Sequence, residues 1–351
     1  MKKRRFLQTA GMGLGVLPVL GFAQPLQKSP LHKKLLPNNL KPGDLVGLIS
    51  PSSATADIMQ FTFAKEAMEG LGLRVIEGKH LRNRSGHLAG TDQERATDLN
   101  EMFANKAVKA IICIRGGSGA SRILPLIDYE TIKNNPKPLV GYSDITALHN
   151  AIHSKTGLIT FHGPNGSGNW GKFNVDQFKR VFFGQNDTIL YENEVEETED
   201  LVIKENRIRT IFPGKAVGDL VGGNLTVLTS LAGSRYLSSF KDKILFLEDI
   251  GEEPYRIDRM MSTLMLMGVF EDIKGFVFGQ CTDCDPSGGY GNLTIDQIFD
   301  DYLLPHKIPA YRGAMIGHIP KQFLLPFGAR VVLDAEKGTL ATTQPIFKQS
   351  K

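Results

Sequence analysis

The stretch PLVGYSDITAL, at residues 138–148, decides the fold of this chain. An apolar run ends there at Gly-x-Ser-Asp and a helical pattern begins at once, which predicts a strand-to-helix corner at Ser143. A serine on such a corner projects its hydroxyl from the carboxyl edge of a sheet, and the next helix turns its unpaired N–H groups toward the same point. That position suits the nucleophile of an acyl-transfer reaction. A plainer alternative stays open, in which Ser143 or Asp144 only caps the helix expected over Ile145–His153.

Upstream of this corner, apolar strand patterns alternate with helical patterns. Strands are expected at 45–50, 73–76 and 107–114, and helices at 58–71 and 91–103. Continuous apolar strands that alternate with helices are typical of an α/β domain with a parallel sheet covered on both faces. Ligands of such sheets bind at the carboxyl ends of the strands, where the serine is expected.

The strand at 107–114 ends in a glycine-rich loop, RGGSGASR at 115–122. This loop lacks the Gly-x-Gly-x-x-Gly pattern of dinucleotide sites and the Gly-Lys-Ser/Thr of a P-loop, so phosphate binding is the weaker interpretation. The missing Cβ atoms of Gly116 and Gly117 instead let a backbone N–H approach a developing oxyanion. We therefore expect the loop to lie at the same sheet edge as Ser143.

Two segments in the second half of the chain end in residues that can activate a serine. Glu248 follows an apolar strand pattern, and His318 ends a strand expected over 314–318. A serine nucleophile needs an imidazole to take its proton and a carboxylate to orient the imidazole. Taken singly, His318 has the alternative of a hydrogen-bonded structural histidine, and Glu248 that of a helix cap or a salt-bridge partner.

A length of 351 residues is more than one core usually serves, so two domains are expected. We place an exposed leader at 24–43 and the N-terminal α/β domain at 44–184. The acidic and polar composition of 185–212 is typical of a solvated crossing between domains. The second domain, 213–351, carries the glutamate and the histidine.

Residues 1–23 have the pattern of a secretory signal. The basic cluster Lys2–Arg5 precedes an apolar run to Leu20, and a small-x-small pattern ends at Ala23. The segment KRRFLQ, at 3–8, resembles a twin-arginine signal in which Lys3-Arg4 takes the place of the strict arginine pair, so the export route stays open between the twin-arginine and general pathways. We expect export to the bacterial periplasm with cleavage after Ala23; an uncleaved amphipathic anchor is the alternative.

The four basic residues of this segment account for the formal charge of +4, because residues 24–351 hold 37 Lys and Arg against 37 Asp and Glu. A chain of zero formal charge offers no electrostatic basis for binding nucleic acid or an anionic membrane surface. It contains no second long apolar run, so no stable membrane anchor is expected. We also expect no metal and no cofactor.

Three cysteines are present, Cys113, Cys281 and Cys284. Cys113 is flanked by isoleucines and is interpreted as a small buried hydrophobe. The Cys281-x-x-Cys284 pair lacks the second ligand pair of a zinc site, so a loop-strengthening disulfide or two free thiols is the better interpretation.

Trp170 is the only tryptophan and lies in a glycine-rich loop, NGSGNWG at 165–171. Two roles stay open for it, an anchor for the loop or a stacking platform for substrate.

Taken together, six segments resemble those of the LD-carboxypeptidases, a serine peptidase family that includes murein tetrapeptide carboxypeptidases and microcin C self-immunity hydrolases. They span most of the chain between residues 44 and 334. The segments are AGTDQERATDL at 89–99, IRGG at 114–117, GYSDITAL at 141–148, GGNL at 222–225, LEDIGE at 247–252, and GH at 317–318 followed by LPFG at 325–328.

The resemblance implies an N-terminal domain with a parallel α/β sheet, of the flavodoxin or glutamine-amidotransferase kind, and a β-rich, barrel-like α+β C-terminal domain. It further implies a site between the domains, a homodimer, and a catalytic set in which Ser143 is the nucleophile, Glu248 the orienting carboxylate and His318 the general acid and base. Around this set we expect the backbone N–H groups of Gly117 and Asp144 as oxyanion donors, and Arg115, Gly116 and Trp170 as substrate contacts.

The activity implied is release of the terminal D-Ala from the L-centre of a peptidoglycan stem tetrapeptide. One alternative is an amidase or peptidase acting on peptidyl or aminoacyl nucleotides. Another is a non-catalytic exported muropeptide-binding protein, which the intact catalytic set disfavours. Two departures matter: Ile145 replaces the second glycine of an α/β-hydrolase elbow, and Ser118 stands where the family often has an aromatic residue.

Overall fold

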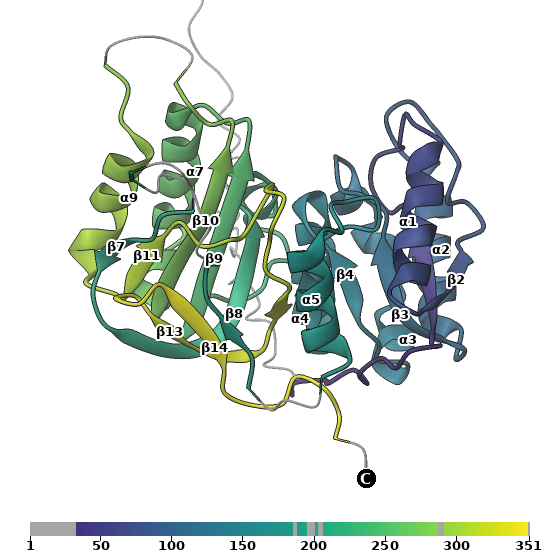
Figure 1. Ribbon diagram of the computed structural model, residues 1–351. Helices are drawn as coiled ribbons and strands as arrows, with labels where there is room; N and C mark the ends of the chain where they lie inside the picture. Colours follow the sequence, from purple (N-terminus) through teal and green to yellow (C-terminus); the bar gives the residue numbers. More distant parts are fainter. Residues whose placement is uncertain (1–32, 185–187, 195–200, 203–205, 287–290, 350–351) are drawn as a thin grey trace, which may run out of the picture.

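The computed structural model describes residues 33–184, 188–194, 201–202, 206–286 and 291–349 of the chain. Two β-sheets lie next to each other in it, and helices pack against each of them (Figure 1). Most strands of the first sheet come from the first half of the chain, and those of the second sheet come from the rest.

The first sheet has six strands in the order β12-β5-β4-β3-β1-β2. Strands β1 to β5 pair in parallel, and β12 runs antiparallel beside β5. The strands are β1 (Leu45–Ile49), β2 (Arg74–Glu77), β3 (Val108–Cys113), β4 (Leu139–Gly141), β5 (Thr160–His162) and β12 (Leu325–Phe327). The helices are α1 (Met59–Gly70), α2 (Asp92–Ala104), α3 (Tyr129–Asn134), α4 (Thr146–Thr156) and α5 (Lys172–Phe182), with 3₁₀ turns η1 (Ala120–Leu126) and η2 (Ser143–Ile145).

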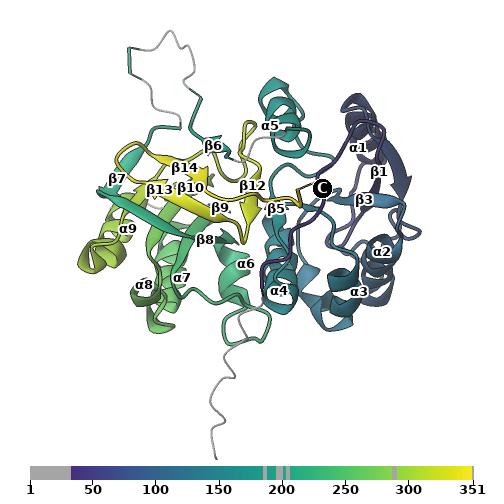
Figure 2. The same cartoon turned by 90° about the horizontal axis from the view of Figure 1, so that it is seen from below.

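Helices cover both faces of this sheet. Figure 2 shows α1 and α5 on one side of it and α2, α3 and α4 on the other. Consecutive residues of a strand point to opposite faces, so Ile111 and Ile112 of β3 belong to different apolar clusters, and both are fully buried. Burial on both faces explains why these strands are apolar at successive positions.

The second sheet has eight strands in the order β6-β14-β13-β8-β9-β10-β11-β7 and curls into a half-barrel. Strands β8 to β11 pair in parallel, and the strands flanking them run antiparallel. The strands are β6 (Leu190–Tyr191), β7 (Arg209–Phe212), β8 (Lys215–Asn224), β9 (Lys243–Ile250), β10 (Gly275–Thr282), β11 (Ala310–Arg312), β13 (Arg330–Asp334) and β14 (Thr339–Thr342). The helices are α6 (Leu225–Ser230), α7 (Pro254–Leu266), α8 (Val269–Asp272) and α9 (Ile295–Leu303), with the 3₁₀ turn η3 (Leu304–His306).

The carboxyl end of β8 meets the beginning of α4, and this contact joins the two halves. The backbone N–H of Asn224 donates to the Thr146 hydroxyl at 2.9 Å, and the Asn150 side chain donates to the Gly222 carbonyl at 3.2 Å. A Cβ on Gly223 would collide with the Thr146 side chain, so glycine is required for the close approach. One buried apolar cluster continues through both sheets.

The expected elements around the serine corner are confirmed as β1, α1, β2, α2 and β3. The expected mixed α/β architecture, with a parallel sheet followed by a β-rich half-barrel, is confirmed as well. No helix among the described residues is long and apolar enough to cross a membrane.

The strand expected over 314–318 is wrong, because that segment is a tightly turned loop that follows β11. Gly313 and Gly317 have φ angles of +94° and +116°, which an extended strand does not allow. Between them, the N–H of Ile316 donates to the carbonyl of Ala314 at 2.7 Å and closes a tight turn.

The segments expected to be an exposed leader and a solvated crossing are partly built into the fold. Within the leader, Leu40 is buried and Leu35 pairs with Leu158, because apolar side chains are interspersed among its polar residues. Within 185–212, the described residues include β6 and β7, the two outermost strands of the second sheet. The signal and cleavage site expected at 1–23 lie outside the described residues.

Candidate active site

Ser143 sits on the corner between β4 and α4, at the first residue of η2. Its φ of +66° lies in the left-handed region, which residues other than glycine adopt rarely and mostly at functional sites. The N-cap position of α4 is Ile145, without a side-chain hydrogen bond, so neither Ser143 nor Asp144 caps this helix. The structure therefore does not have the helix cap that was the plainer alternative for Ser143 and Asp144. Ser143 instead has a left-handed backbone in the turn before the helix.

Gly116 lies directly against this serine. A Cβ on Gly116 would be 2.7 Å from the Ser143 Cβ, 3.0 Å from its Oγ and 3.1 Å from the backbone nitrogen of Asp144. The space beside the hydroxyl therefore exists because residue 116 has no side chain. Gly117 follows with a φ of +118°, which a side chain at that position would disfavour.

The side chain of Asp144 braces the loops around the serine, a role that the sequence analysis missed. It is 5% exposed, and its Oδ2 accepts hydrogen bonds from the Ser52 hydroxyl and from the N–H of Ala120 at 2.7 Å. These contacts join the loops that follow β1, β3 and β4. Burial raises the pKa of this carboxyl, and the two hydrogen bonds oppose that rise.

Glu248 and His318 form a buried pair. The His318 Nδ1–H donates to Glu248 Oε2 at 2.8 Å, with the carboxylate fully buried and the imidazole 15% exposed. A Cβ on Gly317 would be 2.9 Å from Glu248, so the chain can reach this position only with glycine before the histidine. The hydrogen bond at Nδ1 leaves Nε2 as the nitrogen that can accept a proton.

Two independent contacts bring this pair to the serine corner. The ring of Tyr142, the residue before the serine, lies against the His318 ring with centroids 4.8 Å apart. On the other side, Asn224 pairs with Glu248 across β8 and β9, and its N–H donates to Thr146, three residues after the serine. The structure therefore brings Ser143, Glu248 and His318, residues from both halves of the chain, to one junction.

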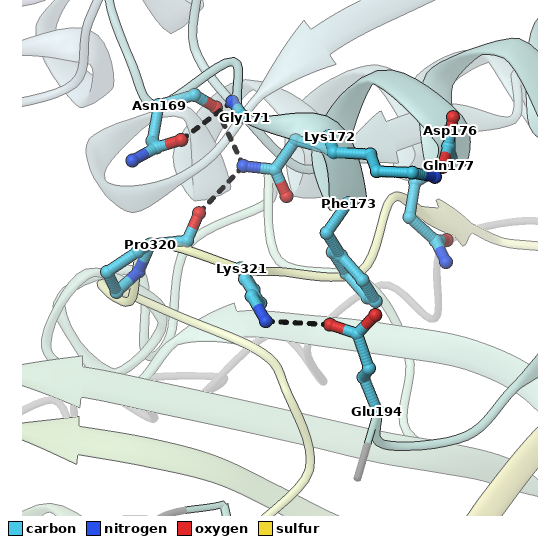
Figure 3. Close-up of a pocket in the computed structure, with 10 residues that line it drawn as sticks. Asn169, Gly171, Lys172, Phe173, Asp176, Gln177, Glu194, Pro320 and Lys321 are labelled. Atoms are coloured by element: carbon cyan, nitrogen blue, oxygen red, sulfur yellow. Dashed lines mark hydrogen bonds and ion pairs between the residues drawn. The ribbon is translucent and has the colours of Figure 1, made fainter. Parts of the chain in front are cut away.

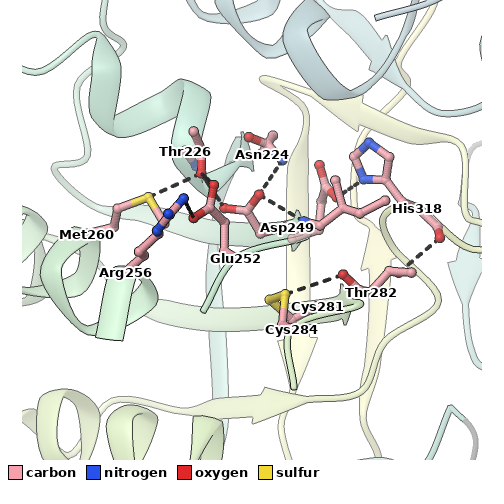
Figure 4. The surroundings of a disulfide bond; sticks show 12 residues. Asn224, Thr226, Asp249, Glu252, Arg256, Met260, Cys281, Thr282, Cys284 and His318 are labelled. Carbon is pink, nitrogen blue, oxygen red and sulfur yellow. Dashed lines mark hydrogen bonds and ion pairs between the residues drawn. A yellow bond between two sulfur atoms is a disulfide. The ribbon is translucent and has the colours of Figure 1, made fainter. Parts of the chain in front are cut away.

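Asp249, next to Glu248, is a structural carboxylate. Its oxygens accept from the Asn224 side chain at 2.9 Å and from the Thr226 N–H and hydroxyl at 3.0 and 2.9 Å, which fixes the start of α6 (Figure 4). Burial, together with the neighbouring negative charge of Glu248, raises the pKa of Asp249 to about 6.

Two residues predicted to contact substrate, Arg115 and Trp170, lie in loops of the first half of the chain. Arg115 precedes Gly116, is half-buried, and donates from Nη1 to the carbonyl of Ala54 at 3.3 Å. The Trp170 indole donates to the Gly166 carbonyl at 2.9 Å and packs on Phe178 with ring centroids 5.7 Å apart, which are the contacts of a loop anchor.

The start of α5 and two loops, one containing Asn169 and the other Pro320, border a cavity of about 350 Å³ (Figure 3). The Asn174 side chain donates to the carbonyls of Asn169, at 2.7 Å, and Pro320, at 2.8 Å, so it ties the two loops together. Lys321 and Glu194 form an ion pair at 2.8 Å on the far side of the cavity. Among the described residues, no cluster of His, Cys, Asp and Glu side chains could hold a metal ion.

Four of the contact residues at this site lie in segments singled out from the sequence. Asn224 lies within the GGNL segment, and Tyr142, Asp144 and Thr146 lie within the GYSDITAL segment. Neither pattern says which partner a side chain contacts, because the contacts depend on how the loops and the two sheets meet.

Comparison with known proteins gives matches over most of the chain. A family model described as the LD-carboxypeptidase N-terminal domain matches residues 46–163, and its counterpart for the C-terminal domain matches residues 217–333. A protein of Bacillus subtilis (strain 168) named "Probable murein peptide carboxypeptidase" is 41% identical over 303 residues, covering 86% of this chain and 92% of that protein. The murein tetrapeptide carboxypeptidase of Pseudomonas aeruginosa is 29% identical over 306 residues, covering 83% of this chain and 94% of its own.

A third relative is the microcin C7 self-immunity protein MccF of Escherichia coli. It is 29% identical over 342 residues, covering 90% of this chain and 98% of its own. Its solved structure in complex with aspartyl sulfamoyl adenosine superimposes with a TM-score of 0.79 at 28% identity, covering 90% of this chain and 100% of the solved one.

Proposed function

The chain belongs to the LD-carboxypeptidase family, and we propose that it is a serine carboxypeptidase that releases the terminal D-Ala from the L-centre of peptidoglycan stem tetrapeptides. The observation that carries this proposal is the buried Glu248–His318 pair beside a serine with a left-handed backbone. The names of the Bacillus and Pseudomonas relatives support the substrate class.

In the proposed mechanism, Nε2 of His318 takes the proton from the Ser143 hydroxyl as Oγ attacks the carbonyl carbon before the terminal D-Ala. The tetrahedral intermediate collapses with cleavage of the C–N bond, and the imidazolium gives its proton to the leaving amine. Water then attacks the acyl-serine ester with the imidazole again as base, which frees the tripeptide carboxylate and restores the hydroxyl. Glu248 holds the imidazole through Nδ1 and stabilises its charged form throughout.

We assign the oxyanion to the backbone N–H groups of Asp144 and Gly117. The Asp144 nitrogen belongs to the turn that begins with the serine, and Gly116 leaves the space beside it open. Donors aimed at the developing negative charge contribute most when they are fixed in advance. The brace between Asp144, Ser52 and Ala120 supplies that rigidity.

A carboxypeptidase must also recognise the free terminal carboxylate, and we assign this role to Arg115. Among the described residues its guanidinium makes one hydrogen bond, the 3.3 Å contact to Ala54, so N–H groups remain for a carboxylate. An Arg115→Gln variant should raise KM more than it lowers kcat.

The place of action is part of the same proposal. The signal pattern at 1–23 supports export to the periplasm, and we propose that the mature enzyme is a homodimer that begins at Gln24 and acts on murein or released muropeptides there. Cell fractionation with N-terminal sequencing tests export and cleavage, since a cytosolic chain beginning at Met1 would refute both. Sedimentation of the mature chain tests the homodimer.

The similarity to MccF supports a second candidate, hydrolysis of an aminoacyl or peptidyl nucleotide. A nucleotide substrate needs a surface on which its base can stack, and the Trp170 indole is the candidate side chain named from the sequence. The contacts of Trp170 with Phe178 and Gly166 favour the carboxypeptidase, because they commit this side chain to packing its own loop against α5.

Incubation of the purified mature chain with a muropeptide tetrapeptide, and separately with an aminoacyl sulfamoyl nucleoside, separates the two candidates. The proposal predicts loss of one alanine from the tetrapeptide by mass spectrometry and slow or no cleavage of the nucleoside conjugate. The reverse preference would establish the nucleotide activity, and no turnover of either compound would favour the non-catalytic binding protein.

A further inference from the structure

A disulfide bond lies at the carboxyl end of β10, beside the candidate active site. It joins Cys281 to Cys284 and closes a small ring that contains Thr282 and Asp283 (Figure 4). Asp283 has a φ of +54°, so the chain turns sharply within the ring. The bond confirms one of the two interpretations that the sequence left open for this pair.

Thr282, inside the ring, holds the backbone of the catalytic histidine. Its hydroxyl donates to the carbonyl of His318 at 3.0 Å, a contact drawn in Figure 4. Two residues earlier along β10, the N–H of Gln280 donates to the carbonyl of Ile316 at 2.9 Å. The loop that carries His318 is therefore attached to the end of β10 by two hydrogen bonds.

The same residue also holds the strand that carries the glutamate. The carbonyl of Thr282 accepts from the N–H of Gly251 at 2.8 Å, and Thr282 pairs with Ile250 in the register of β9 and β10. Thr282 thus bridges the two segments whose side chains form the Glu248–His318 pair. A shift of this residue changes the separation of the two groups.

We propose that Thr282 is a positioning residue for His318 and that the Cys281–Cys284 disulfide holds Thr282 in place. Reduction by a dithiol transfers two electrons and two protons to the sulfurs, cleaves the S–S bond, and leaves two thiols while the dithiol becomes a cyclic disulfide. The freed end of β10 then holds the histidine loop less tightly, and turnover falls. The activity readout rests on the proposed catalytic role of His318.

The disulfide can be reached by such a reductant. Cys281 is partly exposed and Cys284 is 5% exposed, and both line a cavity of about 330 Å³ that opens between β10 and the start of α9. Cys281 is the partly exposed sulfur of the pair, so a small dithiol can attack the bond there without unfolding the protein.

The first test compares kcat and KM of the oxidised chain, the dithiothreitol-reduced chain, and a Cys281→Ser/Cys284→Ser variant, with free thiols counted under native conditions. We expect reduction and the double variant to lower kcat about threefold to tenfold with little change in KM, as for loss of one positioning hydrogen bond. The double variant should not respond further to dithiothreitol. Equal kcat in the oxidised and fully reduced chains would overturn the proposal.

The second test isolates Thr282. Thr282→Val should lower kcat to the level of the reduced chain and remove the response to reduction, whereas Thr282→Ser, which keeps the hydroxyl, should restore both. Thr263→Val is the matched control, because among the described residues the Thr263 hydroxyl bonds only within α7, to the Arg259 carbonyl at 3.0 Å. A Thr282→Val variant with normal kcat, or with a full additional response to reduction, would overturn the proposal.

A readout independent of the substrate separates this proposal from the proposed function. The proton on Nδ1 of His318, held by Glu248, should give a downfield NMR resonance that is lost in a His318→Gln variant. We expect reduction to shift or broaden this resonance in the wild-type chain and to leave it unchanged in Thr282→Val. An unaltered resonance in the reduced wild-type chain would overturn the positioning role whatever the enzyme cleaves.

Discussion

Gly116→Ala is expected to disable the site while leaving the fold intact. The added Cβ would be 2.7 Å from the Cβ of Ser143 and 3.0 Å from its Oγ. Carbon atoms in contact lie about 3.5–4.0 Å apart, so the serine or the loop must move by about 1 Å. Gly116 is not among the residues with a left-handed backbone, so alanine is strained there only by this contact.

The size of the effect follows from that displacement. Misplacing a reacting group by about 1 Å costs roughly 100-fold in rate, so kcat/KM on the tetrapeptide should fall by about that factor. Overpacking of this kind lowers the free energy of unfolding by about 1–3 kcal/mol, which leaves the protein folded at room temperature.

The assay is kcat/KM by chromatography of the released alanine, together with a thermal unfolding curve for each variant. Gly70→Ala at the end of α1 is the matched control, because nothing lies within 4 Å of the Cβ it would add, and it should keep wild-type activity. A Gly116→Ala enzyme within threefold of wild type would refute the close approach of this loop to the serine.

Three further outcomes are expected. Glu248→Gln keeps the shape of the side chain but loses the charge that stabilises the imidazolium, so kcat should fall about 10³-fold to 10⁴-fold. Circular dichroism should show that the variant is folded. Near-normal turnover would mean that another carboxylate orients the histidine. Thr146→Val leaves the buried N–H of Asn224 without its acceptor and should lower the free energy of unfolding, measured by urea titration, by about 1–3 kcal/mol. An unchanged urea midpoint would show that this contact between the halves contributes nothing to stability. Three histidines, two of them buried and one half-buried, should make the protein less stable as the pH falls from 6.5 toward 4. Removal from solvent lowers their pKa, so the unfolded chain takes up protons that the folded chain does not, at about 1.4 kcal/mol per pH unit for each; the raised pKa of Asp249 partly opposes this loss. The histidines are the buried His149 and the half-buried His153, with pKa values of about 4, and the buried His162, whose pKa lies well below its usual range. Urea titrations at pH 7 and pH 5 check this, and equal stability at the two values would count against it.

The sequence was informative where a pattern is local. The apolar run before Ser143 and the helical pattern after it are both determined by neighbouring residues. The structure has that corner, with β4 ending at Gly141, α4 starting at Thr146 and Ser143 in the turn between them. Glu248 follows its apolar run in the same way and lies near the end of β9. These residues could be named as a set because each stands at a recognisable position in its own segment.

The sequence was misleading where position depends on distant contacts. His318 reads as the end of a strand, but Gly313 and Gly317 turn the chain, and their neighbours in space, Arg207 and Glu248, are far away in the sequence. Strand β12 joins the first sheet although it comes from the second half of the chain. Such pairings are set by packing between the two sheets, which no local pattern encodes.

The spacing of Cys281 and Cys284 likewise could not indicate which residues a disulfide between them would position. The role inferred for Thr282 depends on the register of β9 against β10 and on the loop that carries the histidine, and both appear only when the second sheet is assembled.

The central claim is that Ser143 is the covalent nucleophile of a carboxypeptidase. Acid quenching during turnover of the tetrapeptide, followed by proteolysis and mass spectrometry, measures this directly. We predict an acyl adduct, with the mass of the substrate without its terminal alanine, on the peptide that contains Ser143, and we predict neither adduct nor turnover in the Ser143→Ala variant. An adduct on another residue, or a Ser143→Ala enzyme that still releases alanine at a rate near that of the wild type, would contradict the claim.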